Sequence, residues 1–244
     1  MMNLFYTKST QIWVQSNGFV KYLQRKGLDQ SKIKFLPNTV EHFYKPERIH
    51  ENYKKYFPLG FNIVFAGNIG VAQDFDTIIY AASLLKNRNS RINWIIIGDG
   101  REKSKIIERI RKKDLSECFH FLGSFPSSEM PSFFACADAL LVSLKSSEIF
   151  SLTIPSKLQS YLACGKPIIG NLEGIAASII LESNSGFCSS SGDYNSLAYN
   201  VDALYSMGLR EREQLGLNAY NYYLENFDRN YVYNTLTKYL EEDA

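Results

Sequence analysis

The sequence predicts an α/β fold built on a doubly wound parallel sheet. From residue 61 onward, short apolar runs alternate with amphipathic stretches, which is the strand–helix–strand pattern of parallel sheets. The runs are apolar at every position rather than at every second one, as expected for strands covered on both faces. Five strands are expected, over residues 61–66, 92–97, 119–122, 139–142 and 167–170.

Helices are expected between these strands. In the first helical stretch, one apolar stripe is formed at helical spacing by Phe75, Ile78, Ile79, Ala82 and Leu85. The remaining helices are expected over residues 103–113, 127–136, 157–164, 194–207 and 210–242, the last with an interruption near 226–229.

The first 60 residues differ from this pattern. Residues 1–45 contain a short strand, a helix and a second strand, which are too few elements for a core of their own. We interpret them as the tail of a preceding Rossmann-like domain with its junction; the alternative is that they add a strand to the main sheet. Residues 46–60 are interpreted as a linker and residues 61–244 as the main domain.

The composition excludes several classes of protein. The 244 residues are 45% hydrophobic and 21% charged, as in a soluble globular protein, and the net charge of +2 argues against a nucleic-acid partner. Four cysteines form no C-x-x-C pair, which argues against zinc and against a dense disulfide framework. No apolar stretch is long enough for a signal peptide or a membrane span, so a cytoplasmic protein is expected.

Ligands of doubly wound sheets bind in the loops at the carboxyl ends of the strands. After the first main strand, Gly67-Asn68-Ile69-Gly70 would let the backbone approach a phosphate, and a helix after Gln73 would supply free N–H groups. A plain tight turn is the alternative. Because the loop is not G-x-G-x-x-G, a nicotinamide enzyme is disfavoured. After the second strand, Asp99 is a candidate helix cap, and after the third, Ser124 and Phe125 could face a planar base.

Residues 146–170 are the segment richest in candidate functional residues. Pro155 fits just ahead of a helix, with Ser156 as the candidate N-cap. Lys157 then lies in the first helical turn, where a cation is unfavourable for the helix dipole unless an anion binds there. A solvated surface lysine is the alternative. The three histidines are isolated from one another, so neither a catalytic triad nor a metal site can be proposed.

Several motifs, taken in order, resemble the C-terminal half of a family 4 glycosyltransferase. They are G-N-I-G-x-x-Q, W-I-I-I-G-D-G-R-E, F-L-G-S-F-P, A-D-A-L-L-V-S-L and I-P-S-K-L-Q-S-Y-L-A-C-G-K-P-I-I-G. The sequence is similar to bacterial transferases of capsule and O-antigen assembly, including those for fucosamine, from about residue 10 to the end. The resemblance implies a GT-B architecture of two Rossmann-like domains. It also implies retaining transfer, without metal or cofactor, from a nucleotide-diphosphate sugar, with a UDP-sugar expected first, to a glycan or lipid-linked acceptor.

The resemblance also assigns residues to the donor site. It places Lys157 as the catalytic cation beside the leaving diphosphate. It implies that Ser124 and Phe125 face the base, and that Gln159 or Ser160 meets the ribose. The diphosphate and sugar would be met by Gly67, Asn68, Gly70, Gln73, Ser151, Leu152, Thr153 and Ser156, with Glu173 near the donor.

The sequence departs from the family pattern at the donor site. Many members carry Arg and Lys at the positions of Asn68 and Gln73, so phosphate charge is left to Lys157, backbone amides and helix dipoles. Many also carry two glutamates where this chain has Leu152 and Ser160, the second of which binds the ribose.

Family members are usually well over a hundred residues longer, and the part without a counterpart here is most of the N-terminal domain. We therefore expect either a fragment or a partner chain that supplies that domain. Two alternatives to the transferase stay open: a donor-binding subunit or remnant without activity of its own, and, more remotely, a nucleotide-sugar epimerase. Peripheral contact with the inner face of the membrane also stays open, because acceptors of this kind are often lipid-linked.

Overall fold

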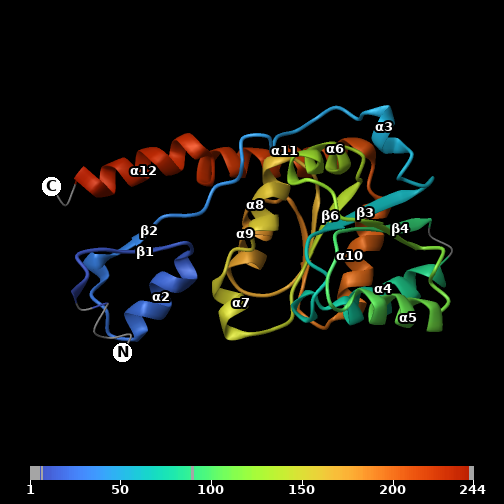
Figure 1. Cartoon of the computed structure of the whole chain (residues 1–244), viewed down its shortest axis with the longest axis horizontal. Coiled ribbons are helices and arrows are strands. Elements are labelled where there is room, and N and C mark those ends of the chain that lie inside the picture. Colours follow the sequence, from blue (N-terminus) through green and yellow to red (C-terminus); the bar gives the residue numbers. More distant parts are fainter. Residues whose placement is uncertain (1–5, 7, 89–90, 242–244) are drawn as a thin grey trace.

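The computed structural model describes residues 6, 8–88 and 91–241, and it consists of a large α/β domain, a small N-terminal unit and two long C-terminal helices (Figure 1). The large domain is built on a six-stranded sheet in which all strands are parallel. Its strands run in the order β5 (Phe119–Gly123), β4 (Ile92–Ile97), β3 (Phe61–Ala66), β6 (Ala139–Ser143), β7 (Ile168–Asn171) and β8 (Gly186–Ser189). The predicted fold class is confirmed.

Helices cover both faces of this sheet. One face packs against α4 (Phe75–Lys86), α5 (Lys103–Lys112) and α10 (Tyr194–Ser206). The other face packs against α6 (Met130–Ala135), α8 (Ser156–Ala163), α9 (Ile175–Glu182) and α11 (Leu209–Asn226). Because both faces are covered, every residue of β3 and β4 is buried, which explains their continuous apolar sequence.

The five predicted strands are all present, and the sixth, β8, was not predicted. The sheet reverses its strand order between β3 and β6, so the loops after these strands leave in different directions and open a crevice at their carboxyl ends. Two short 3₁₀ turns lie at this end of the sheet, η2 (Val71–Gln73) and η3 (Ser127–Glu129).

The N-terminal unit has a sheet of its own. β1 (Ile12–Val14) pairs in parallel with β2 (Ile33–Phe35), and α2 (Asn17–Arg25) and η1 (Gln30–Lys32) connect them. Neither strand joins the main sheet, so the alternative that this segment extends that sheet is wrong. Its own buried cluster consists of Val14, Leu23 and Ile33.

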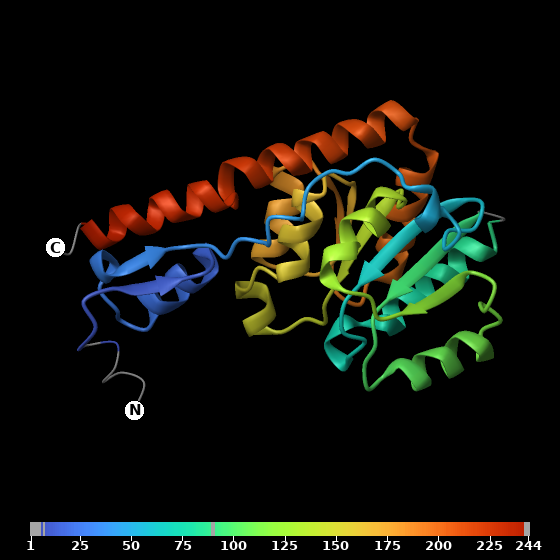
Figure 2. The same ribbon diagram turned by 45° about the horizontal axis from the view of Figure 1, so that its top comes forward.

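Contacts on two sides attach the N-terminal unit to the rest of the chain. Helix α12 (Arg229–Glu241) runs back along it (Figure 2), and the Tyr239 hydroxyl donates to the Phe35 carbonyl at 3.1 Å. On another side, α2 meets the short helix α7 (Glu148–Leu152) so closely that a Cβ on Gly18 would lie 3.0 Å from the Cα of Leu152.

The segment between the N-terminal unit and β3 includes the predicted linker, and it contains one short helix, α3 (Glu51–Lys54). Near its start, the side-chain Nε2 of Gln159 donates to the carbonyl of Asn38 at 2.6 Å. This bond holds the segment against α8, so its next residues lie beside the carboxyl ends of the strands.

Candidate functional site

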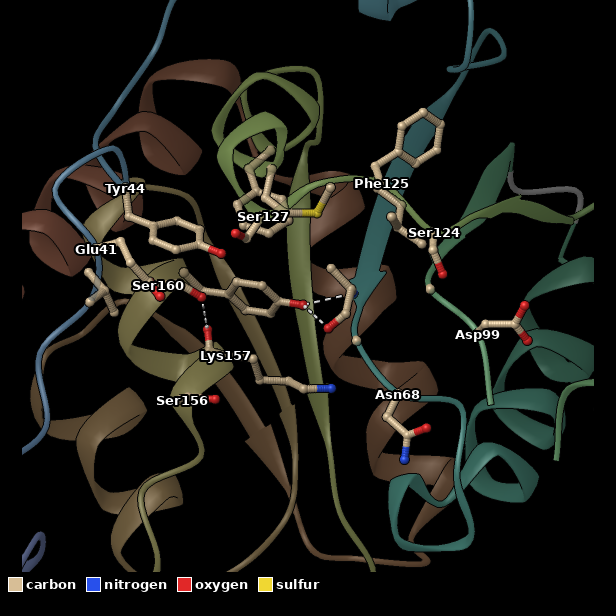
Figure 3. Close-up of a pocket in the computed structure, with 18 of the residues that line it drawn as sticks. Glu41, Tyr44, Asn68, Asp99, Ser124, Phe125, Ser127, Ser156, Lys157 and Ser160 are labelled. Atoms are coloured by element: carbon tan, nitrogen blue, oxygen red, sulfur yellow. Dashed lines mark hydrogen bonds between the residues drawn. The ribbon is translucent and has the colours of Figure 1, made fainter. Parts of the chain in front are cut away.

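A cavity of about 760 Å³ lies at the carboxyl ends of β3, β4 and β5 (Figure 3). Its walls come from the loops after these three strands, from α6 and the first turns of α8, and from the segment that follows the N-terminal unit. It is lined by Thr39, Val40, Glu41, Tyr44, Ala66, Gly67, Asn68, Gln73, Ile97, Gly98, Asp99, Ser124, Phe125, Ser127, Met130, Phe134, Ser156, Lys157, Ser160 and Tyr161.

Lys157 is the cation of this cavity. Its Nζ donates to the side-chain oxygen of Gln73 at 2.9 Å and lies 3.7 Å from the centre of the Phe65 ring. No carboxylate among the described residues forms an ion pair with it. Burial without a counter-ion lowers the pKa of Lys157 to about 7. The contacts of the amine with Gln73 and the Phe65 ring argue against the alternative of a solvated surface lysine.

The position of Lys157 adds a second source of positive potential. It is the second residue of α8, so its amine shares the cavity with the unpaired N–H groups of a helix start. Pro155 is the N-cap of this helix and Ser156 its first residue, and no side chain caps it. The prediction that Ser156 is the N-cap is wrong, because Pro155 already has the extended backbone that this position needs.

Close backbone packing shapes the floor of the cavity. A Cβ on Gly98 would lie 2.0 Å from the carbonyl oxygen of Gly67, and both glycines have a positive φ that disfavours other residues. The Gly67 amide donates to Ile97 and the Gly98 amide to Gly123, so the three loops continue the sheet ladder. Asp99 accepts from the Gly100 amide at 2.7 Å, and α5 begins only after Glu102, so the prediction that Asp99 caps that helix is wrong.

Gln73 owes its position to a buried carboxylate next to it. Asp74 has the left-handed φ of 48°, and its side chain accepts hydrogen bonds from Thr77, Asn171 and the Gly192 amide at 2.7, 3.3 and 3.2 Å. These bonds fix the turn between η2 and α4. The side chain of Gln73 is thereby held against the Lys157 amine.

Tyr161 keeps the crevice open at the switch point of the sheet. β3 and β6 pair only at Ile63–Ala139 and Val64–Leu140, and beyond this the two strands diverge. The Tyr161 hydroxyl accepts from the Ala66 amide at 2.9 Å and lies 3.4 Å from the Ala66 carbonyl. A side chain from α8 thus replaces the β6 partner of Ala66, which pairs with β4 alone.

The structure brings together eight of the fourteen residues assigned by resemblance. These are Gly67, Asn68, Gln73, Ser124, Phe125, Ser156, Lys157 and Ser160. The Ser160 hydroxyl donates to the Lys157 carbonyl at 3.0 Å. The roles of these residues toward a donor stay predictions.

The other six residues lie outside the lining of this cavity. Ser151, Leu152 and Thr153 lie at the end of α7, where the Ser16 hydroxyl donates to the Leu152 carbonyl. Glu173 accepts from Ser146 at 2.8 Å in a separate small pocket. Gln159 is turned toward Asn38, and Gly70 lies beside the amide of Asn68.

Sequence reasoning missed the cavity wall from the segment before β3, namely Thr39, Val40, Glu41 and Tyr44, and it missed Tyr161. The position of the first four depends on a hydrogen bond between Gln159 and Asn38, which are 121 residues apart. Tyr161 could have been found, since a polar aromatic residue on a buried helix needs a partner for its hydroxyl.

The described part of the chain contains neither a metal site of the usual ligands nor a helix that could span a membrane. Within residues 6, 8–88 and 91–241, no group of three or more His, Cys, Asp or Glu residues is arranged to hold a metal ion. In that same part of the chain, no helix combines the length and the apolar character that crossing a membrane requires.

Comparison with known proteins identifies relatives of this cavity-bearing domain. The chain is similar to the probable glycosyltransferase WbjE of Pseudomonas aeruginosa, with 30% identity over 150 residues that make up 59% of this chain and 36% of that protein. It is also similar to the amylovoran biosynthesis glycosyltransferase AmsK of Erwinia amylovora, with 24% identity over 66% of this chain and 40% of that protein. The chain thus spans well under half the length of these relatives.

Among solved structures, Anabaena Alr3699/HepE in complex with UDP has the same fold, with a TM-score of 0.85 at 16% identity. The match covers 98% of this chain and 66% of that protein. The family model described as glycosyl transferases group 1 matches residues 57–222. These include the whole six-stranded sheet and every residue of the cavity lining except Thr39, Val40, Glu41 and Tyr44. The chain therefore belongs to the glycosyl transferases group 1 family.

Proposed function

We propose that the cavity is the donor site of a sugar transferase and that it binds the diphosphate of a nucleotide sugar. One observation carries this proposal: the Lys157 amine lies in the cavity at a helix N-terminus without a carboxylate partner. A buried cation in this state is stabilised by a bound anion. A diphosphate is an anion of suitable charge, and the glycine backbone of the adjoining loops lets it approach closely.

The cavity is large enough for more than a phosphate group. A volume of about 760 Å³ suits a whole nucleotide sugar. With the diphosphate at Lys157 and Gly67, the base would lie against Ser124 and Phe125, whose ring forms part of the wall. UDP is the first donor nucleotide to test, because Anabaena Alr3699/HepE binds UDP and shares this fold.

In the proposed reaction, the bond between the sugar and the diphosphate breaks and negative charge develops on the leaving diphosphate. Lys157 and the amides of the α8 start would stabilise that charge more strongly in the transition state than in the ground state. The family resemblance supports retention of the anomeric configuration and membership of the family 4 fucosamine-transferase-like group.

The acceptor would be a glycan or a lipid-linked sugar of a bacterial surface polysaccharide. The name of one relative supports this, the amylovoran biosynthesis glycosyltransferase AmsK. We propose that the large domain supplies the donor-binding part, and that an acceptor-binding part, in the same or a partner polypeptide, completes the transferase.

Calorimetric titration with UDP, GDP and their sugars tests this proposal. We expect one of the two nucleoside diphosphates to bind with a Kd on the order of micromolar. Failure of all of them to bind would contradict a donor site in this cavity.

A further inference from the structure

Glu41 is a carboxylate in the cavity that has no hydrogen-bond donor. Of the residues that line the cavity, the acidic ones are Glu41 and Asp99. The Asp99 carboxylate already accepts from the Gly100 amide and pairs with Lys103. Within the part of the chain that the structure describes, the Glu41 carboxylate forms neither a hydrogen bond nor an ion pair. It therefore has acceptor capacity for a ligand.

Two hydroxyl groups lie on the same side of the cavity as Glu41. Figure 3 shows Glu41 and Tyr44, from the segment before β3, on the side where Ser160 projects from α8. Burial and the nearby charge of Glu41 raise the pKa of Tyr44 to about 12, so this hydroxyl keeps its proton and can donate. This wall thus combines one anionic acceptor with two neutral hydroxyls.

The segment that carries Glu41 is held in place. The Tyr44 amide donates to the Glu41 carbonyl at 3.0 Å, which closes a turn. Three residues before Glu41, the Asn38 carbonyl accepts from Gln159, the neighbour of Ser160 on α8. The backbone that carries Glu41 is therefore held beside the turn of α8 that carries Ser160.

The charge of this wall decides which part of a ligand it can take. A carboxylate repels a diphosphate, so the phosphates belong at Lys157 and a neutral group with hydrogen-bond donors belongs at Glu41. A ribose offers two adjacent hydroxyl donors, and a carboxylate can accept from both. Ser160 adds a weaker neutral partner, because its own proton is donated to the Lys157 carbonyl.

We propose that Glu41 is the ribose-binding residue of this chain and accepts hydrogen bonds from the 2′- and 3′-hydroxyls of the donor nucleotide. This inference rests on the proposed function, since it needs a nucleoside diphosphate in the cavity. If so, the segment between the N-terminal unit and β3 determines which nucleotide the cavity prefers. A nucleotide without the 2′-hydroxyl then binds more weakly, because it makes one hydrogen bond fewer to the Glu41 carboxylate.

A titration of four ligands on three proteins tests this. The proteins are the wild type, Glu41→Ala and the control Glu148→Ala, which removes an equally exposed carboxylate outside the cavity. The ligands are UDP, GDP, the 2′-deoxy counterpart of whichever of these binds more tightly, and pyrophosphate. Because Glu41 is exposed, its replacement by Ala is expected to leave the fold intact, and circular dichroism checks this.

For the wild type we expect the deoxynucleotide to bind about tenfold more weakly than the ribonucleotide, the usual effect of losing a hydrogen bond to a charged group. Glu41→Ala should weaken the ribonucleotide by more than this factor, because both hydroxyl bonds are lost. It should weaken the deoxynucleotide less, because only the 3′-hydroxyl bond is lost, and it should leave pyrophosphate unchanged. Glu148→Ala should match the wild type.

Two results would overturn the inference in distinguishable ways. If the wild type binds a nucleoside diphosphate and Glu41→Ala binds it equally well, the ribose assignment is wrong and the donor site stands. If the wild type binds neither nucleoside diphosphates nor pyrophosphate, the donor site itself fails and the ribose assignment falls with it.

Discussion

Raising the pH from 7 to 9 should weaken the binding of a nucleotide sugar to this cavity about fiftyfold. The reason is the pKa of Lys157, which burial lowers to about 7. An anion binds the charged amine, and a bound diphosphate raises that pKa again, so binding above pH 7 requires uptake of a proton. With a tenfold loss per pH unit above the pKa, the dissociation constant rises by a factor of about 50 between pH 7 and pH 9.

Calorimetry with the UDP- or GDP-sugar that binds measures this effect. A nucleotide sugar is the better probe, because a terminal phosphate itself titrates near pH 6 and would obscure the result. Repeating the titration at pH 8 in buffers of different ionisation enthalpy should show uptake of about 0.9 proton per ligand bound.

Two variants separate Lys157 from other charged groups. Lys157→Met should bind weakly at every pH, and the wild type should still bind more tightly than this variant at pH 9, because its amine takes up a proton in the complex. Lys145→Met removes an exposed lysine outside this cavity and should keep the pH dependence of the wild type. A wild-type affinity that changes less than twofold between pH 7 and pH 9 would refute the role given to the buried amine.

Three further substitutions test the structure around the cavity. Tyr161→Phe leaves the Ala66 amide without its acceptor. It should lower the free energy of unfolding, measured by urea denaturation, by about 1–3 kcal/mol and should also lower the affinity for the donor. Unchanged stability would exclude the hydrogen bond. Gly98→Ala should lower the free energy of unfolding by at least about 1–3 kcal/mol, because the glycine has a positive φ. The loss should exceed that of Gly192→Ala, because a Cβ at Gly192 meets no atom within 4 Å. Equal losses would contradict the backbone packing at Gly98. Gly18→Ala crowds α7 and should speed hydrogen exchange in α2, whereas unchanged exchange would argue against that close contact.

Much of the fold could be predicted because its signals are local. Strands covered on both faces are continuous apolar runs, and β3 and β4 have the predicted bounds. β8 was missed because its four residues include Gly186, Cys188 and Ser189, which give no β pattern. The break between α11 and α12 was found where the apolar spacing is interrupted.

The candidate site could be predicted only in the part that depends on strand ends. Gly67, Gln73 and Lys157 follow from the rule that ligands bind at the carboxyl ends of parallel strands. Glu41 and Tyr44 were not predicted, because long-range contacts bring their segment to the cavity, among them the packing of Val40 and Tyr44 against the main core and the hydrogen bond from Gln159 to Asn38. The same bond explains why Gln159 itself, assigned to the ribose by resemblance, points elsewhere.

The most direct test of the central claim compares a nucleoside diphosphate with its nucleoside on the wild type and on Lys157→Ala. Because the claim is that the Lys157 amine holds the diphosphate, the substitution should weaken the nucleoside diphosphate by at least about tenfold and leave the affinity for the nucleoside unchanged. Equal losses for both ligands, or no loss for either, would contradict the account.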